Sequence, residues 1–287
     1  MNPEKIAILA DSCCDVPARE AAEKGFFVVP LRILGDDGEH ADGVDIFPAD
    51  IYQRLAAGET LKTSLPSGAS VEHVLDEIKA QGYEKVIALM LSSGLSGTYN
   101  LLRVTAQTRD DLELAVYDTK CGSIGISTVV YQLQKDIEAG MGWEELTTRR
   151  VPQLVSNTSA FFSVDTLEYL QKGGRIGLVT AMAGAMLNIK PILTFAQDGQ
   201  LTSMAKVRGT KQVIAKLDDT HRQLKGEHKR FNVAVANGGD PENMELLRAQ
   251  VAEAFPDCEN FWDGEIGATL SVYIGPGILG VSITILD

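Results

Sequence analysis

The chain has 287 residues, 45% of them hydrophobic, which is enough for about two domains with sizeable cores and excludes intrinsic disorder as its main state. Its 26 Lys and Arg against 39 Asp and Glu give a net charge of −13, so nucleic acids and anionic lipid surfaces are poor candidates as partners. No apolar run approaches the ~18 residues that indicate a membrane span, so we expect no membrane-spanning segment.

The N-terminal residues and the cysteines bear on location. Residues 1–5 lead directly into a short apolar stretch that ends at Asp11, a pattern unlike a secretory signal. The four cysteines form no paired C-x-x-C set, so we expect neither a disulfide framework nor a zinc site. Both features predict a protein of the reducing cytoplasm.

In the first half of the chain, short apolar runs alternate with segments of helical periodicity, which predicts a parallel sheet covered by helices. The expected strands are residues 6–10, 26–34, 86–91 and 114–117. The expected helices are residues 17–24, 48–57, 70–81, 98–108 and 123–139, and a loop is expected over 58–68.

The pattern changes in the second half, where hairpins mix with helices. Asp198-Gly199 is typical of a hairpin turn. The expected strands are residues 160–164, 190–195, 200–207, 232–237 and 281–286, and the expected helices are 143–156, 211–225 and 242–254. We therefore predict an α/β protein of two domains. Residues 1–157 form an N-terminal parallel-sheet α/β sandwich, and residues 158–287 form a C-terminal α+β domain with a mixed sheet.

A hydroxyl-rich loop is the most informative polar segment. Residues 91–98 read Leu-Ser-Ser-Gly-Leu-Ser-Gly-Thr and lie between an expected strand and an expected helix. In a parallel sheet this is the carboxyl end of a strand, where ligands usually bind. Hydroxyls and backbone N–H groups at a helix N-terminus suit an anion such as a carboxylate or a phosphate. The alternative is an ordinary N-cap turn, which needs no ligand.

Two other polar segments are less specific. Residues 62–67, Lys-Thr-Ser-Leu-Pro-Ser, form a second hydroxyl-rich stretch, which alone is best explained as a solvated turn. Asp11, Ser12 and Asp15 follow the first expected strand. Paired carboxylates can bind a metal ion or act as acid and base, but capping of the next helix is the better explanation here.

The sequence offers little catalytic machinery. None of the four histidines lies in a hydroxyl- or glycine-rich motif, and we expect surface positions for His221 and His228 near charged helix ends. A nucleophilic serine therefore has no evident base. Residues 275–280 match the dinucleotide pattern G-x-G-x-x-G, but a strand rather than a helix is expected after them. We interpret them as a glycine turn and expect no cofactor.

Seven segments, by their order and spacing, resemble the DegV family of bacterial fatty-acid-binding proteins. Each segment is weak alone, but the ordered set is specific and covers essentially the whole chain. The segments are residues 11–15 (DSCCD), 63–67 (TSLPS), 92–99 (SSGLSGTY), 165–176 (DTLEYLQKGGRI), 187–193 (LNIKPIL), 206–208 (KVR) and 275–277 (GPG).

The resemblance implies one long-chain fatty acid of the palmitate or oleate class, held between the two domains without covalent chemistry. It implies that the hydroxyls of Thr63 and Ser93 hold the carboxylate. Ser64, Ser96 and Tyr273 complete the expected head-group site. The N-terminal domain then carries the head-group loops, and the C-terminal domain covers the acyl chain.

The resemblance also implies a possible partner. Some family members present the bound acid to a separate ATP-dependent fatty acid kinase, which phosphorylates the carboxylate. On this basis Arg175 and Arg208 are expected to meet such a kinase. Both are local positive charges on an acidic chain, and solvated strand and helix ends explain them equally well.

One position departs from the family. Many members have a histidine two residues before the Gly-Pro-Gly turn, where this chain has Tyr273. A phenol donates a hydrogen bond but is neutral at pH 7, so the head-group pocket lacks one possible cation. The apolar run over residues 182–187 offers small and soft side chains for an acyl tail, although core packing is the better explanation for any single one.

The two hydroxyl-rich segments, together with the family resemblance, predict a fatty-acid-binding carrier that is not itself an enzyme. The alternative is an α/β transferase or hydrolase that acts on a small phosphorylated or acyl substrate at residues 92–98. A third interpretation is an adaptor that docks a partner through its basic segments. A long apolar cavity favours the carrier, whereas a compact polar cleft lined by carboxylates favours the enzyme.

Overall fold

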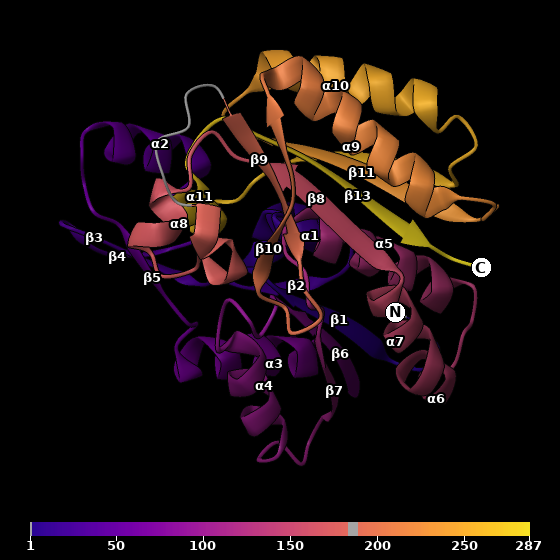
Figure 1. Ribbon diagram of the computed structural model, residues 1–287. Coiled ribbons are helices and arrows are strands. Elements are labelled where there is room, and N and C mark those ends of the chain that lie inside the picture. The colour runs from indigo at the N-terminus through magenta and orange to yellow at the C-terminus, as the bar shows by residue number, and fades with distance from the viewer. Residues whose placement is uncertain (1, 183–188) are drawn as a thin grey trace.

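The computed structural model describes residues 2–182 and 189–287, and these residues form three sheets (Figure 1). The first is a parallel sheet with the strand order β2-β1-β6-β7. Its strands are β1 (Ile6–Asp11), β2 (Phe27–Val29), β6 (Lys85–Met90) and β7 (Glu113–Asp118). Strands β1 and β6 are buried along almost their whole length, which explains their continuous apolar runs. The predicted parallel sheet is confirmed.

Helices cover both faces of this sheet. Alternate residues of β1 join different hydrophobic clusters, with Ile8 on the side of α5 (Ile124–Glu138) and Leu9 on the side of α3 (Gly68–Ala80). Helix α5 is buried along most of its length because it packs against β1 and also against the sheet of the second half. Helix α4 (Thr98–Ala106) begins directly after the hydroxyl-rich loop, as predicted.

A small antiparallel sheet, β4-β3-β5, is absent from the sequence prediction. Its strands are β3 (Arg32–Gly35), β4 (Gly38–Ala41) and β5 (Lys62–Ser64). The single strand expected over 26–34 is wrong, because the run divides at Pro30, which has no N–H to donate, and its two parts join different sheets. The loop expected over 58–68 is also wrong in part, since β5 pairs with β3 and places Thr63 opposite Ile33.

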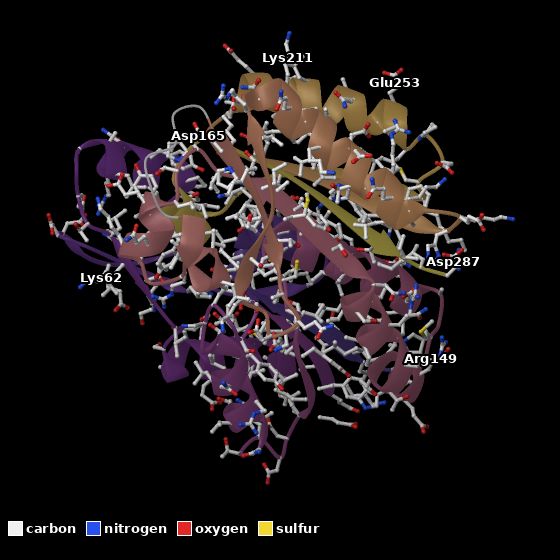
Figure 2. All side chains as sticks on the ribbon, viewed as in Figure 1. Lys62, Arg149, Asp165, Lys211, Glu253 and Asp287 are labelled. Atoms are coloured by element: carbon white, nitrogen blue, oxygen red, sulfur yellow. The ribbon has the colours of Figure 1, made fainter. Side chains whose placement is uncertain are left out.

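The second half contains a six-stranded mixed sheet with the order β10-β9-β8-β13-β11-β12. Its strands are β8 (Thr158–Ser163), β9 (Ile189–Phe195), β10 (Leu201–Arg208), β11 (Phe231–Gly238), β12 (Asn260–Glu265) and β13 (Ile278–Ile285). Helices α9 (Thr210–Lys225) and α10 (Pro241–Ala254) cover its outer face (Figure 1), and Figure 2 shows Lys211 and Glu253 on these helices extending away from the sheet. The predicted β9–β10 hairpin is confirmed. Strand β12 escapes prediction because it is a half-exposed edge strand with Asp, Gly and Glu, which are rare in strands.

One irregular helix joins the two halves, as the sequence predicts for 143–156. It comprises α6 (Trp143–Glu145), a π-helical stretch (Leu146–Arg150) and α7 (Val151–Ser156). The other helices are α1 (Ala18–Glu23), α2 (Pro48–Ala56), α8 (Glu168–Lys172) and α11 (Ala268–Ile274), with 3₁₀ turns at Ser12–Cys14 and Gly177–Met182. Whether residues 1–157 and 158–287 are separate domains stays a prediction. Among the described helices, none has both the length and the apolar character that a membrane crossing requires.

His221 does not have the surface position expected from the sequence. It follows Val213 and Leu217 at intervals of four on α9, so it shares their buried face. Its ring nitrogens lie 2.6 Å from the Leu217 carbonyl and 3.1 Å from the Val281 carbonyl. Burial lowers the pKa of His221 to about 4, so the ring is neutral at pH 7.

The Gly-Pro-Gly segment forms the predicted glycine turn. Gly275 and Gly277 have φ angles of +66° and +87°, which favour glycine, and strand β13 follows directly. A dinucleotide site needs a helix at this point, whereas a strand follows, as the sequence predicts.

Candidate functional site

An apolar cavity of about 270 Å³ lies between the two halves of the chain. Side chains from the parallel-sheet loops, the small sheet, α11 and the mixed sheet all line it. No Asp, Glu or His of the described residues lines the cavity, although the chain has 39 acidic residues. Arg175 is the one charged side chain among the described lining residues.

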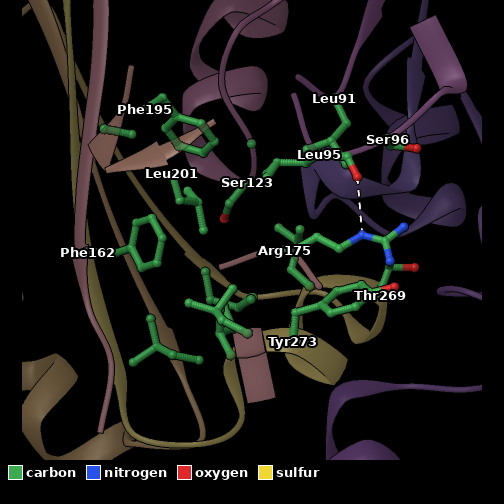
Figure 3. Close-up of a pocket in the computed structure, with 18 of the residues that line it drawn as sticks. Leu91, Leu95, Ser96, Ser123, Phe162, Arg175, Phe195, Leu201, Thr269 and Tyr273 are labelled. Atoms are coloured by element: carbon green, nitrogen blue, oxygen red, sulfur yellow. Dashed lines mark hydrogen bonds between the residues drawn. The ribbon is translucent and has the colours of Figure 1, made fainter. Parts of the chain in front are cut away.

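The mixed sheet forms the apolar wall of the cavity. Gly280 of β13 pairs with Phe162 of β8 on one side and with Ala236 of β11 on the other. All three residues line the cavity, and the missing side chain at Gly280 leaves space on this face of the sheet. Figure 3 shows Phe162 and Phe195 on the side of the cavity away from the Arg175 guanidinium. The wall thus suits a hydrocarbon chain.

The opposite end of the cavity is polar. Thr63 of β5 and Tyr273 of α11 share a hydrogen bond of 2.5 Å between their hydroxyl oxygens, so the sheet pairing of β5 fixes where this pair lies. Ser64 and Ser96 also line the cavity. The Ser64 hydroxyl donates to the Leu65 carbonyl (3.1 Å), and the Ser96 hydroxyl lies 2.9 Å from that of Thr98. The structure therefore brings four of the five expected head-group residues to one cavity.

Arg175 brings a positive charge to this polar end. Its guanidinium carbon lies 4.9 Å from the centre of the Tyr273 ring. Its nitrogens donate to the carbonyls of Gly173 (2.8 Å) and Leu95 (3.4 Å), and Figure 3 shows the contact with Leu95. No carboxylate of the described residues pairs with Arg175, so its charge is available to an anion. A Cβ on Gly173 would overlap Cδ1 of Tyr273, which explains the glycine before Gly174 and Arg175.

Ser93 and Arg208 lie apart from the cavity wall. The Ser93 hydroxyl accepts a hydrogen bond from Lys120 Nζ (3.1 Å), and Ser93 is not among the lining residues. Arg208 is the exposed last residue of β10 and does not line the cavity either. Their predicted roles, with the carboxylate and with a kinase, stay predictions. Of the apolar run at 182–187, residues 183–187 lie outside the described residues.

Asp11, the last residue of β1, has a structural role. The Asp11 carboxylate accepts hydrogen bonds from the Cys13 and Leu91 amides at 3.1 and 2.8 Å, so Asp11 caps the 3₁₀ turn Ser12–Cys14, whereas α1 begins after Pro17 without a side-chain cap. The Asp42 carboxylate accepts from the Ser12 hydroxyl at 2.7 Å. Burial raises the pKa of Asp11 to about 7. Among the described residues, no group of three potential ligands is arranged to hold a metal ion.

Comparisons with known proteins agree with this architecture. A profile of the DegV family, described as uncharacterised, matches residues 5–285. A DegV domain-containing protein of Clostridium acetobutylicum is 34% identical over 280 residues, which are 98% of this chain and 99% of the relative. A second one, from Clostridium perfringens, is 35% identical over 280 residues, or 98% of each chain.

Solved structures match the whole fold. A DegV family protein from Thermus thermophilus, whose structure is described as showing fatty acid binding, is 29% identical. Its TM-score is 0.91 over 100% of both chains. A stearic acid-binding protein of Eubacterium ventriosum is 26% identical with a TM-score of 0.86 over 98% of both chains. The predicted fold class, with a parallel-sheet part and a mixed-sheet part, is confirmed.

Proposed function

The chain belongs to the DegV family, and from that premise we propose that it binds one long-chain fatty acid non-covalently, in the cavity between its two halves. One observation carries the proposal. The cavity is apolar along the mixed sheet and has hydroxyls and a single arginine at the other end, with no carboxylate among the described lining residues. This distribution matches a molecule with a long hydrocarbon tail and one anionic group.

The energetics of such a ligand fit this division. Each buried methylene contributes ~0.8 kcal/mol, so fourteen contribute roughly 11 kcal/mol before the association cost of on the order of 4–15 kcal/mol. The head group needs hydrogen bonds because a buried unpaired carboxylate is costly. We propose that Thr63, Tyr273, Ser64, Ser96, Ser93 and Arg175 supply them.

Mass spectrometry of the denatured, purified protein tests the function directly. We expect a long-chain acid of the palmitate or oleate class in roughly equimolar amount. The delipidated protein should then take up added oleate. If no acyl species is found and no added oleate or palmitate binds, the proposed function is wrong.

Thr63→Val should weaken oleate binding by ~1–3 kcal/mol, or about 10- to 100-fold, because it removes one head-group hydrogen bond. Titration calorimetry on delipidated protein measures the change. Thr108→Val makes the same substitution at an exposed residue near the end of α4 and should leave affinity unchanged. Equal oleate affinities for the wild type and Thr63→Val would show that Thr63 does not bind the head group.

We propose a carrier rather than a transferase or hydrolase at residues 92–98. The described cavity residues include no acid and no histidine that could act as a general base. Lys120, which contacts the Ser93 hydroxyl, is ion-paired with Asp118 at 2.7 Å. An ammonium group has no lone pair with which to accept the serine proton. The free thiols of the four cysteines fit the reducing cytoplasm, where we propose the protein acts.

We further propose that the bound acid is presented to a separate ATP-dependent fatty acid kinase. Arg175 supports this proposal because it lines both the cavity and an adjoining surface groove. Arg175→Glu should reduce capture of the kinase from a lysate by at least tenfold, since it reverses the charge offered at this groove. Arg19→Glu, at an exposed residue of α1, is the control. Equal capture by the two variants would contradict the proposal.

A further inference from the structure

A second cavity, of about 410 Å³, differs from the apolar cavity in its charge. It lies among α1, the start of α2, α5 and β12, and its size is within the ~300–1,000 Å³ typical of small-molecule sites. Of the described residues, Ile124 alone lines both cavities. None of the described residues that line the second cavity is Lys, Arg or His, and five are acidic. The five are Asp15, Glu20, Asp42, Asp263 and Glu265.

The chain itself compensates only some of this negative charge. Lys24 Nζ lies 3.0 Å from Glu20 Oε1, and Arg248 Nε lies 3.4 Å from Asp263 Oδ2. Neither cation lines the cavity. The lining carboxylates that have no ion pair in the described part of the chain are those of Asp15, Asp42 and Glu265.

The carboxyl group of Asp15 is buried without a hydrogen-bond partner. Both of its oxygens are buried, and no described residue donates to either in hydrogen-bond geometry, although Ser123 and Gly267 lie beside them. Asp42 is 4% exposed and accepts from the Ser12 hydroxyl at 2.7 Å, but no cation lies against it in the described chain. Burial raises the pKa of both carboxyl groups, and an ammonium group next to them would favour their ionised forms. A bound cation would thus remove the cost of an unpaired buried carboxylate.

Two aromatic rings belong to the same lining. The rings of Tyr131 on α5 and Trp262 on β12 have their centres 5.2 Å apart. Lys24 Nζ lies 4.3 Å from the centre of the Tyr131 ring, and Lys135 Nζ lies 5.9 Å from that of Trp262. Both rings therefore already lie in surroundings that hold cations. An aromatic face also packs against methylene groups, so this wall suits an organic cation.

The distribution of the carboxylates decides the kind of cation. In the part of the chain that the structure describes, no three potential ligands are arranged to hold a metal ion. The carboxylates lie instead at two depths, since those of Asp15 and Asp42 are buried whereas Glu265 is exposed. A metal ion collects its ligands at one point, but a polyamine carries ammonium groups along an aliphatic chain. We propose that this cavity binds an aliphatic polyamine, with one ammonium group at Asp15 and Asp42 and another at Glu265.

Titration calorimetry of the full chain with spermidine tests the proposal. Asp15→Asn keeps the shape of the side chain and removes its charge, so the Kd for spermidine should rise at least tenfold. Glu265→Gln should raise it at least threefold, and this exposed position serves as a second variant if Asp15→Asn does not fold. Asp110→Asn is the matched control, because it makes the same change of charge at an exposed residue outside the cavity, and its Kd should stay within twofold.

A comparison of ligands tests the requirement for two ammonium groups. Butylamine, which has one, should bind at least tenfold more weakly than spermidine. Three results would overturn the inference: no saturable binding of spermidine, equal Kd values for Asp15→Asn and Asp110→Asn, or displacement of spermidine by an equal concentration of Mg²⁺. The second would show a general attraction to an acidic chain, and the third would show a metal site. None of these results bears on fatty acid binding, which is proposed for the other cavity.

Discussion

A leucine in place of Gly280 should reduce the affinity for stearate about 100-fold or more. Any side chain at this position leaves the sheet on the cavity face, between Phe162 and Ala236. A Cβ built there lies 3.4 Å from Phe162 Cβ, and Gly280 has no positive φ, so the strand itself accepts the change. The leucine side chain then takes the space of about four methylenes, which is worth ~3 kcal/mol of binding.

The affinity series that checks this includes a smaller side chain and a shorter ligand. Gly280→Ala should change the stearate Kd less than threefold, because it adds one carbon at ordinary contact distance. Decanoate, which needs less of the cavity, should bind Gly280→Leu about as well as it binds the wild type. If stearate binds Gly280→Leu and the wild type equally, the acyl chain does not run along this wall.

His221 should make the fold less stable as the pH falls from 7 to 4. Burial lowers the pKa of His221 from the ordinary histidine value of 6.5 to about 4 in the folded chain, so the unfolded chain binds more protons between these values. The contribution is therefore fully present above pH 6.5 and is lost as the pH falls toward 4, by about 3 kcal/mol in all. Urea unfolding of the wild type and of His221→Gln at pH 7, 6 and 5 measures this contribution. It is the difference between the two proteins in how steeply the free energy of unfolding changes with pH.

The buried carboxyl groups change the pH dependence of stability in the direction opposite to His221, so the test needs a matched variant. Burial raises the pKa of Asp11 to about 7, so its contribution is greatest at low pH and is lost as the pH rises toward 7. Asp11 is present in both proteins, so its effect cancels when the His221→Gln curve is subtracted from that of the wild type. Parallel stability curves for the two proteins would show that His221 is not buried as the structure places it.

The loops at the sheet edge could be predicted because they depend on local sequence. The hydroxyl-rich loop after β6 lies between a short continuous apolar run and a segment of helical periodicity, and both are evident in the local sequence. Lys120 leaves the same edge of the sheet after β7, and its contact with Ser93 follows from the parallel pairing of β6 and β7.

Other features depend on tertiary structure. Strand β5 is three residues long and is stabilised by pairing with β3, so nothing in residues 62–64 alone distinguishes it from a loop. The burial of His221 depends on the face of α9 that meets the sheet. The cavity depends on Gly280 facing Phe162 and Ala236, which are far apart in sequence. Ser93 contacts Lys120 and does not line the cavity. This arrangement likewise depends on three-dimensional packing.

The close packing of Gly173 against the ring of Tyr273 couples two positions that lie 100 residues apart in the chain. As long as the tyrosine is present, any larger residue at 173 meets the aromatic ring at less than contact distance. A smaller side chain at 273 would remove the overlap with the ring and leave the Tyr169 carbonyl oxygen, at 3.2 Å, as the remaining close neighbour. Substitutions at the two sites are therefore epistatic, and the order in which they accumulate during divergence is constrained: the ring must be lost before the glycine can vary.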